Sequence, residues 1–68
     1  MKYAVVIERS ESGFGAYVPD LPGCIAVAET LAETERLIRE AIEFHLKGLR
    51  EDGIRTPEPS TVAQYVEV

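Results

Sequence analysis

A long stretch with helical periodicity, residues 30–53, constrains the fold more than any other part of the sequence. Thr30 supplies a hydroxyl that caps a first helical turn, and Glu33, three residues later, completes the pattern of a capping box. Gly53 follows the last good helix former and suits the left-handed residue that ends many helices. No proline interrupts the stretch. The pattern predicts one long amphipathic helix.

The expected helix has one apolar face and one charged face. The apolar face is formed by Leu31, Leu37, Ile38, Ala41, Ile42, His45 and Leu49. On the opposite side, charges alternate in sign every four residues at Glu35, Arg39, Glu43, Lys47 and Glu51. Such neighbours stabilise a helix by roughly 0.2–0.5 kcal/mol per pair. A helix of this kind has to lie on an apolar surface, and the rest of the chain has to supply that surface.

The chain has 68 residues and a net charge of −5. A domain of this size buries only about 60% of its unfolded surface, and such domains usually need a disulfide, a metal or self-association. Cys24 is the only cysteine and His45 the only histidine, so neither an internal disulfide nor a structural zinc site is available. We expect one domain, residues 1–68, with no cofactor and no metal, stabilised by self-association or a permanent partner.

The acidic charge indicates what this chain contacts. Phosphate binding needs a basic surface, so we expect no direct contact with nucleic acid. A net charge of −5 suits a basic protein partner. The N-terminus becomes charged too early for a signal peptide, and no apolar run approaches membrane-spanning length. The sequence therefore predicts no membrane contact and a reducing, cytoplasmic setting.

Four segments rich in β-branched and small apolar residues favour strands: Lys2–Glu8, Phe14–Val18, Cys24–Ala28 and Thr61–Glu67. A short turn at residues 10–13 makes the first two antiparallel. The predicted fold is α+β, a two-layer β-β-β-α-β arrangement with one long helix on one face of an antiparallel or mixed sheet. Both faces of this sheet are apolar; in the third strand, Ile25 and Val27 lie on the side opposite Ala26.

One helix covers only one face of such a sheet. We therefore expect the second face, or a strand edge, to meet another chain, with a homodimer as the first choice and a tetramer as the second. The alternative is that strand twist and the C-terminal segment cover the second face.

A distinctive corner, Tyr17-Val18-Pro19-Asp20-Leu21-Pro22-Gly23-Cys24, joins the second and third expected strands. Its two prolines and one glycine fix a tight turn, and that role alone is enough to explain them. The corner is followed by Ala28-Glu29-Thr30, Glu51-Asp52-Gly53 and Pro57-Glu58-Pro59-Ser60. In this order and spacing, the motifs resemble the HicB antitoxin family, and the likeness runs from Tyr3 to Val66.

The resemblance implies a function that composition and periodicity do not reach. HicB-like proteins neutralise HicA, a small basic toxin that cleaves mRNA, and their domain resembles a partial RNase H-type fold without catalytic activity. We therefore expect a binding module that occludes a HicA-type toxin, and charge complementarity would speed their association. Many members carry a further DNA-binding module; this sequence ends at Val68, so we expect no direct operator binding.

The candidate partner-binding residues lie at the corner, which we expect to be exposed, and near the C-terminal edge. They are Tyr17, Asp20, Leu21, Tyr65 and Glu67. His45 and Cys24 are interpreted as residues of the core or of an interface. Two other functions stay open: an orphan oligomeric domain without a toxin, and a residual metal-dependent nuclease. The nuclease is disfavoured because a two-metal site needs clustered carboxylates and residues 3–7 offer none.

Overall fold

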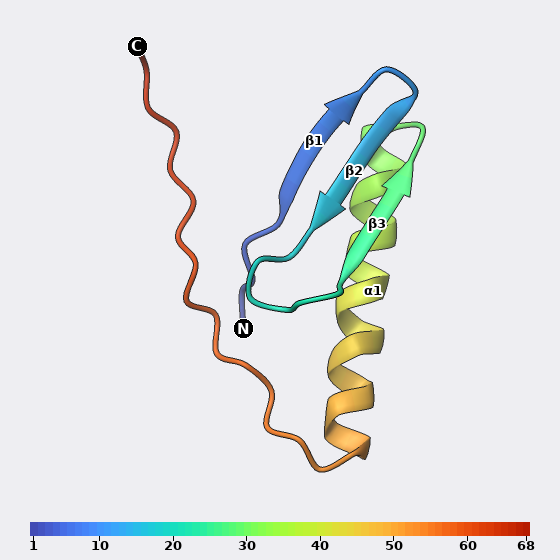
Figure 1. The fold of residues 1–68 in the computed structure, drawn as a ribbon, viewed down its shortest axis with the longest axis vertical. Coiled ribbons are helices and arrows are strands. Elements are labelled where there is room, and N and C mark those ends of the chain that lie inside the picture. The colour runs from blue at the N-terminus through green and yellow to red at the C-terminus, as the bar shows by residue number, and fades with distance from the viewer.

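The computed structural model describes residues 1–68. Three strands, β1 (Val6–Ser10), β2 (Gly13–Tyr17) and β3 (Ile25–Ala28), precede one long helix, α1 (Leu31–Glu51). The strands form an antiparallel sheet in the order β1-β2-β3, and α1 lies behind it (Figure 1). The helix backbone approaches β2 and β3 closely but not β1. The predicted α+β arrangement with one helix on one face is confirmed.

The first strand lies further along the chain than the sequence predicted. Lys2–Glu8 was the expected range, whereas the ladder begins at Val6, which pairs with Tyr17. The reason is that β2 ends there: the next residue, Val18, turns away and donates its N–H to the carbonyl of Cys24 at 3.2 Å. The segment Lys2–Val5 therefore has no neighbouring strand.

The corner between β2 and β3 consists of two successive turns. Leu21 donates its N–H to the carbonyl of Val18, and Cys24 donates to the carbonyl of Leu21, both at 3.1 Å. Gly23 has a φ of 85°, which suits the third position of a type II turn with Pro22 before it. The two turns direct Val18, Leu21 and Cys24 inward, and all three are buried. Leu21 has an exposed fraction of 0%, so its predicted exposure is wrong.

The predicted N-cap of α1 is confirmed, but the capping box is only half formed. Glu33 donates its backbone N–H to the hydroxyl of Thr30 at 3.1 Å. The carboxylate of Glu33 does not return to Thr30; it pairs with Arg36, which also binds Glu40 at 2.8 Å. These are the two ion pairs of the chain. The charges that alternate in sign every four residues from Glu35 to Glu51, which were predicted to pair, form no ion pair.

The C-terminal end of α1 is closed as the sequence predicted. Gly53 is left-handed, with a φ of 71°. Ile54 donates its N–H to the carbonyl of Leu49 at 2.9 Å, and Gly53 donates to the carbonyl of Arg50 at 3.1 Å. This pair of bonds is a Schellman motif, which satisfies carbonyls that the helix leaves without a partner.

The core lies between α1 and the sheet and is small. Its buried hydrophobic residues are Ala16, Val18, Leu21, Cys24, Ile38 and Leu46. Burial raises the pKa of the Cys24 thiol, in agreement with the interpretation of this residue as a buried hydrophobe. Sequence periodicity missed two inward residues, Leu46 and Thr34; the Thr34 hydroxyl donates to the carbonyl of Thr30 at 2.8 Å. It also wrongly placed Leu31 on the buried face, because Leu31 is exposed.

The expected fourth strand, Thr61–Glu67, does not form. After α1, residues 54–68 form neither helix nor strand. The last of these residues lie on the β1 side of the sheet and diverge from β1 toward the C-terminus (Figure 1). A strand exists only with a hydrogen-bonding neighbour, and this segment has none within the chain. We call residues 62–68 the tail.

Glycine is required at position 13 because the hairpin packs tightly against the end of β3. The register pairs Ser10 with Gly13 and leaves a two-residue loop. Gly13 has a φ of 155°, and a Cβ added there would collide with the carbonyl oxygen of Ala28. We predict that Gly13→Ala lowers the free energy of unfolding by about 1–3 kcal/mol, because the clash is with backbone that cannot move aside.

The matched control is Gly48→Ala. Gly48 lies within α1, and a Cβ there would meet nothing within 4 Å. This substitution should raise the free energy of unfolding by about 0.5–1 kcal/mol because alanine is the better helix former. Urea unfolding at one fixed protein concentration measures both variants. A Gly13→Ala protein as stable as the wild type would contradict the assigned clash.

Candidate partner-binding surfaces

The face of the sheet turned away from α1 is apolar and exposed. Val6, Tyr17 and Ile25 stand in one row across the three strands, because the register pairs Val6 with Tyr17 and Tyr17 with Ile25. Val27 lies on the same side, opposite Gly15. The exposed fractions are 65% for Ile25 and 74% for Val27. We call these four side chains, Val6, Tyr17, Ile25 and Val27, the outer face. Val6 is half-buried, and the exposure of the other three confirms that one helix leaves an apolar face uncovered.

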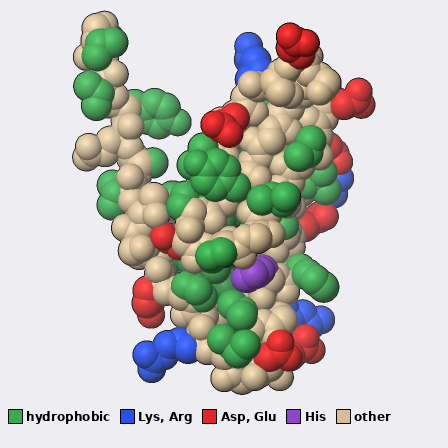
Figure 2. Space-filling view, in the orientation of Figure 1, with side chains coloured by type: hydrophobic (Ala, Val, Ile, Leu, Met, Phe, Trp, Pro, Cys, Tyr) green, Lys and Arg blue, Asp and Glu red, His purple; other side chains and the backbone are tan.

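Hydrophobic side chains also gather more widely over one side of the molecule. In the space-filling view they lie over the sheet and the middle of the helix, whereas charged side chains stand at the margins (Figure 2). His45, the only histidine, lies at the surface of this view and is half-buried. Single exposed apolar residues are ordinary, but a contiguous group bordered by charges is typical of a protein-binding surface.

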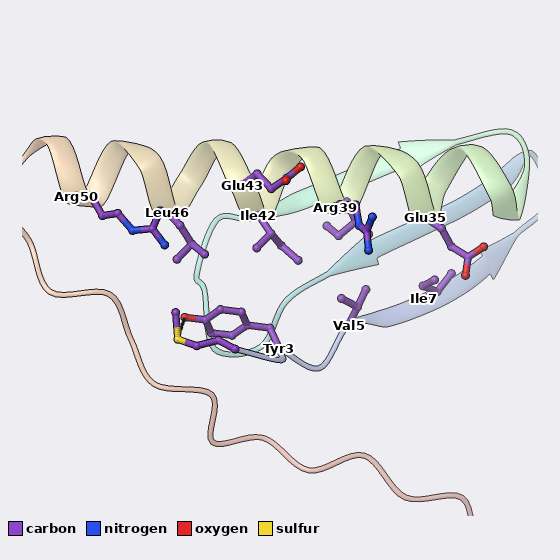
Figure 3. A pocket seen from close by; sticks show the side chains of 11 residues that line it. Tyr3, Val5, Ile7, Glu35, Arg39, Ile42, Glu43, Leu46 and Arg50 are labelled. Carbon is purple, nitrogen blue, oxygen red and sulfur yellow. Dashed lines mark hydrogen bonds between the residues drawn. The ribbon is translucent and has the colours of Figure 1, made fainter.

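A second apolar feature is the groove between α1 and the N-terminal segment, with a volume of about 740 Å³. Its apolar lining comes from both sides: Met1, Tyr3, Val5, Ile7, Ile38, Ile42 and Leu46. Charged side chains of alternating sign, Glu35, Arg39, Glu43 and Arg50, line its helical side (Figure 3). The groove exists because α1 packs under β2 and β3 and leaves β1 unsupported.

The segment after α1 is fixed to the body of the protein at two points. Tyr3 donates its hydroxyl to the carbonyl of Pro57. Asp20 then accepts the N–H groups of Ser60 and Thr61, at 2.9 and 3.0 Å, and both of their hydroxyls, at 3.1 and 2.8 Å. The N–H of Thr61, followed by that of Ser60 and by the hydroxyls, lowers the pKa of Asp20 from 3.8 to about 2.

Beyond Thr61 the tail makes no contact that would bury it. Every residue from Ser60 to Val68 is exposed, and Tyr65 and Val68 are fully so. Alternation places Val62, Val66 and Val68 on one side of an extended chain. The tail is thus an exposed apolar segment with the sequence pattern of a strand, and the residues just before it, Ser60 and Thr61, are held by Asp20.

Comparison with known proteins identifies the family. The family described as "HicB-like antitoxin of bacterial toxin-antitoxin system" matches residues 3–68. The chain belongs to this family.

Relatives of this HicB-like protein occur in a phage, an archaeon and a bacterium. An uncharacterised 14.9 kDa protein of Haemophilus phage HP1 is 38% identical over 97% of this chain, and the chain spans about half of that protein, 50% of its length. A "UPF0150 protein" of Archaeoglobus fulgidus is 45% identical to this chain. The match covers 78% of this chain and 81% of the length of the archaeal protein. A second "UPF0150 protein", from Helicobacter pylori, is also 45% identical. That match covers 72% of this chain and 68% of the length of the Helicobacter protein.

A solved structure shares the fold. The fold of this chain matches a chain of the structure titled "HicA3 and HicB3 toxin-antitoxin complex", with a TM-score of 0.73 and 30% sequence identity. The match covers 88% of this chain and 70% of the chain in that structure. The likeness agrees with the three antiparallel strands and the long helix described above.

The five candidate residues of this HicB-like chain have different surroundings. Tyr17 lies on the outer face, and Tyr65 and Glu67 are exposed on the tail. The carboxylate of Asp20 is occupied by hydrogen bonds within the chain, and Leu21 is buried in the core. Contact with a partner stays a prediction for all of them.

Sequence analysis did not select the two most exposed residues of the outer face, Ile25 and Val27, although their alternation with small residues carried the signal. It also missed Ser60 and Thr61 as partners of Asp20, because nothing in the local pattern relates residues 40 positions apart.

No three of the histidine, cysteine, aspartate and glutamate side chains come within reach of one metal ion. No helix is both long and apolar enough to cross a membrane.

We predict that acid releases the start of the tail. The folded-state pKa of Asp20, about 2, lies below the ordinary value of 3.8, so the ionised carboxylate stabilises the attachment above pH 4. That contribution is lost as the pH falls through the folded-state value, because the protonated group accepts these bonds poorly. Amide chemical shifts of Ser60 and Thr61, followed by NMR from about pH 6 to about pH 1, measure the release.

Asp20→Ala should give the released shifts already at neutral pH, whereas Glu58→Gln, a change at an exposed acid nearby, should leave them unchanged. Methyl signals of Leu21 in the same spectra report whether the core stays folded. If the Ser60 and Thr61 signals of Asp20→Ala coincide with those of the wild type, the attachment through Asp20 is wrong.

Proposed function

We propose that this chain is an antitoxin that binds and occludes a HicA-type toxin, a small basic mRNA-cleaving protein, without catalysing a reaction itself. The observation that carries the proposal is the family match over residues 3–68. The 30% identity and TM-score of 0.73 to a chain of a HicA3–HicB3 complex support it. Occlusion needs only a surface complementary to the toxin, so it requires no catalytic side chains in this chain.

We assign toxin binding to the outer face. Tyr17, Ile25 and Val27 provide a flat apolar centre, and aromatic and aliphatic residues of this kind contribute most of the energy of protein interfaces. Glu8 lies on the same side of β1, because it pairs with Gly15 of β2 opposite Val27. The net charge of −5 attracts a basic partner over a distance and raises the association rate.

We further propose that the protein acts in the cytoplasm as a homodimer, with a tetramer as the second possibility. A core of six buried hydrophobic residues is small for an independent domain. A second copy would add buried apolar surface that one chain does not contain.

The direct test is co-expression with the small basic protein encoded by the adjacent gene. An antitoxin should restore growth that the toxin alone arrests, and the two proteins should purify together. If no neighbouring protein arrests growth or binds, the function is instead that of the orphan oligomeric domain considered from the sequence.

We predict that Val27→Asp weakens toxin binding at least about tenfold, because it buries a charge in the apolar centre of the interface. Val27 is 74% exposed, so the fold should survive the change. The matched control is Phe44→Ser, which removes an exposed apolar side chain from α1 rather than from the outer face. Titration calorimetry gives both affinities, and circular dichroism checks the folding of each variant. Equal losses for the two variants would contradict the assignment to the outer face.

A further inference from the structure

The free edge of β1 and the segment before it lack a strand partner. β1 pairs only with β2, so one side of its backbone carries unpaired N–H and C=O groups. Lys2–Val5 have a strand-like sequence but no neighbouring strand on either side, because β2 ends opposite Val6. Unpaired edges of this kind readily accept another strand.

The groove beside this edge is apolar and open. Tyr3, Val5 and Ile7 face Ile42 and Leu46 of α1 across it (Figure 3). A strand added to the edge of β1 would lie over this groove and place every second side chain into it. The occupant therefore has to be an extended segment with apolar residues at alternate positions.

The tail of the same protein has these properties. Residues 61–68 equal residues 3–10 in number, and both segments span about 3.3 Å per residue when extended. Val62, Val66 and Val68 share one side, and all three are exposed in the single chain. Within the tail only Glu67 is charged, and residues 3–10 carry one acid and one base, Glu8 and Arg9, so the two segments meet with little net repulsion.

The tail of one chain is not placed to fill the groove of that same chain. Its start is held by the four hydrogen bonds between Asp20 and the pair Ser60 and Thr61. From there it diverges from β1 instead of lying along it (Figure 1), and all its side chains are exposed. A second copy presents the same open edge and groove without this restriction.

We infer that two copies of this chain exchange their tails: residues 61–68 of each copy form a strand on the free edge of β1 of the other. Val62, Val66 and Val68 enter the groove between β1 and α1 of the partner copy. The exchange is reciprocal, so two copies satisfy both edges and the assembly closes. The outer face is not used, so this dimer forms without a toxin and leaves the proposed toxin-binding surface open.

The oligomeric state of the full chain tests the inference. Light scattering coupled to gel filtration should give the mass of a dimer for the wild type. Val66→Asp should raise the dimer dissociation constant at least about tenfold and give a monomer at low concentration; the exposure of Val66 in the single chain means that the monomer should still fold. Ala63→Asp introduces the same charge on the opposite side of the tail and should preserve the dimer.

A second measurement identifies the donor of the strand. In a sample mixed from isotope-labelled and unlabelled protein, isotope-filtered NOEs should connect the methyl groups of Val66 with those of groove residues (Val5, Ile7, Ile42 or Leu46) on the other copy. NOEs within one chain, a dimer without tail contacts, or a wild-type monomer would each overturn the inference. Val27→Asp should leave the dimer intact, so loss of toxin binding and loss of tail exchange are separately observable.

Discussion

A single helix cannot cover both faces and both edges of a three-stranded sheet, and every surface feature of this protein follows from that constraint. α1 packs under β2 and β3, where it buries Ala16, Ile38 and Leu46. Two regions remain uncovered: the outer face, with Ile25 and Val27 exposed, and the groove beside β1. Since both are apolar, the chain gains buried surface only by joining other chains.

The corner between β2 and β3 connects the small core to the C-terminal segment. Its two turns insert Leu21 into the core, and the residue before it, Asp20, consequently faces outward at a fixed position. The Asp20 carboxylate then holds Ser60 and Thr61 through four hydrogen bonds. The direction in which the tail leaves the protein is therefore determined by core packing at the corner and not by the sequence of the tail itself. The prolines and glycine of this corner suffice to explain a tight turn, and the burial of Leu21 agrees with that structural role.

Local signals predicted the parts of the fold that depend on neighbours in sequence. The helix follows from periodicity, and its ends follow from the hydroxyl of Thr30 and the left-handed Gly53. Errors occurred where a distant neighbour decides the outcome: the expected strand at residues 61–67 finds no partner within the chain. The same limit applies to the site. Alternation along β3 indicated that two apolar faces exist, but only the register shows that Tyr17 and Ile25 stand side by side.

The distribution of charge is compatible with the two kinds of partner that we propose. Nine of the 19 charged side chains lie on α1, whereas the tail carries only Glu67 and residues 3–7 carry none. In the proposed dimer, two copies of an acidic protein would therefore meet through their least charged segments, where mutual repulsion is small. The proposed basic toxin, in contrast, would be attracted by the whole acidic molecule and would dock where apolar residues are exposed. The two proposed interactions would thus depend on different forces: apolar burial for the dimer and long-range charge attraction for the toxin. High salt should therefore lower the association rate of the toxin far more than the stability of the dimer.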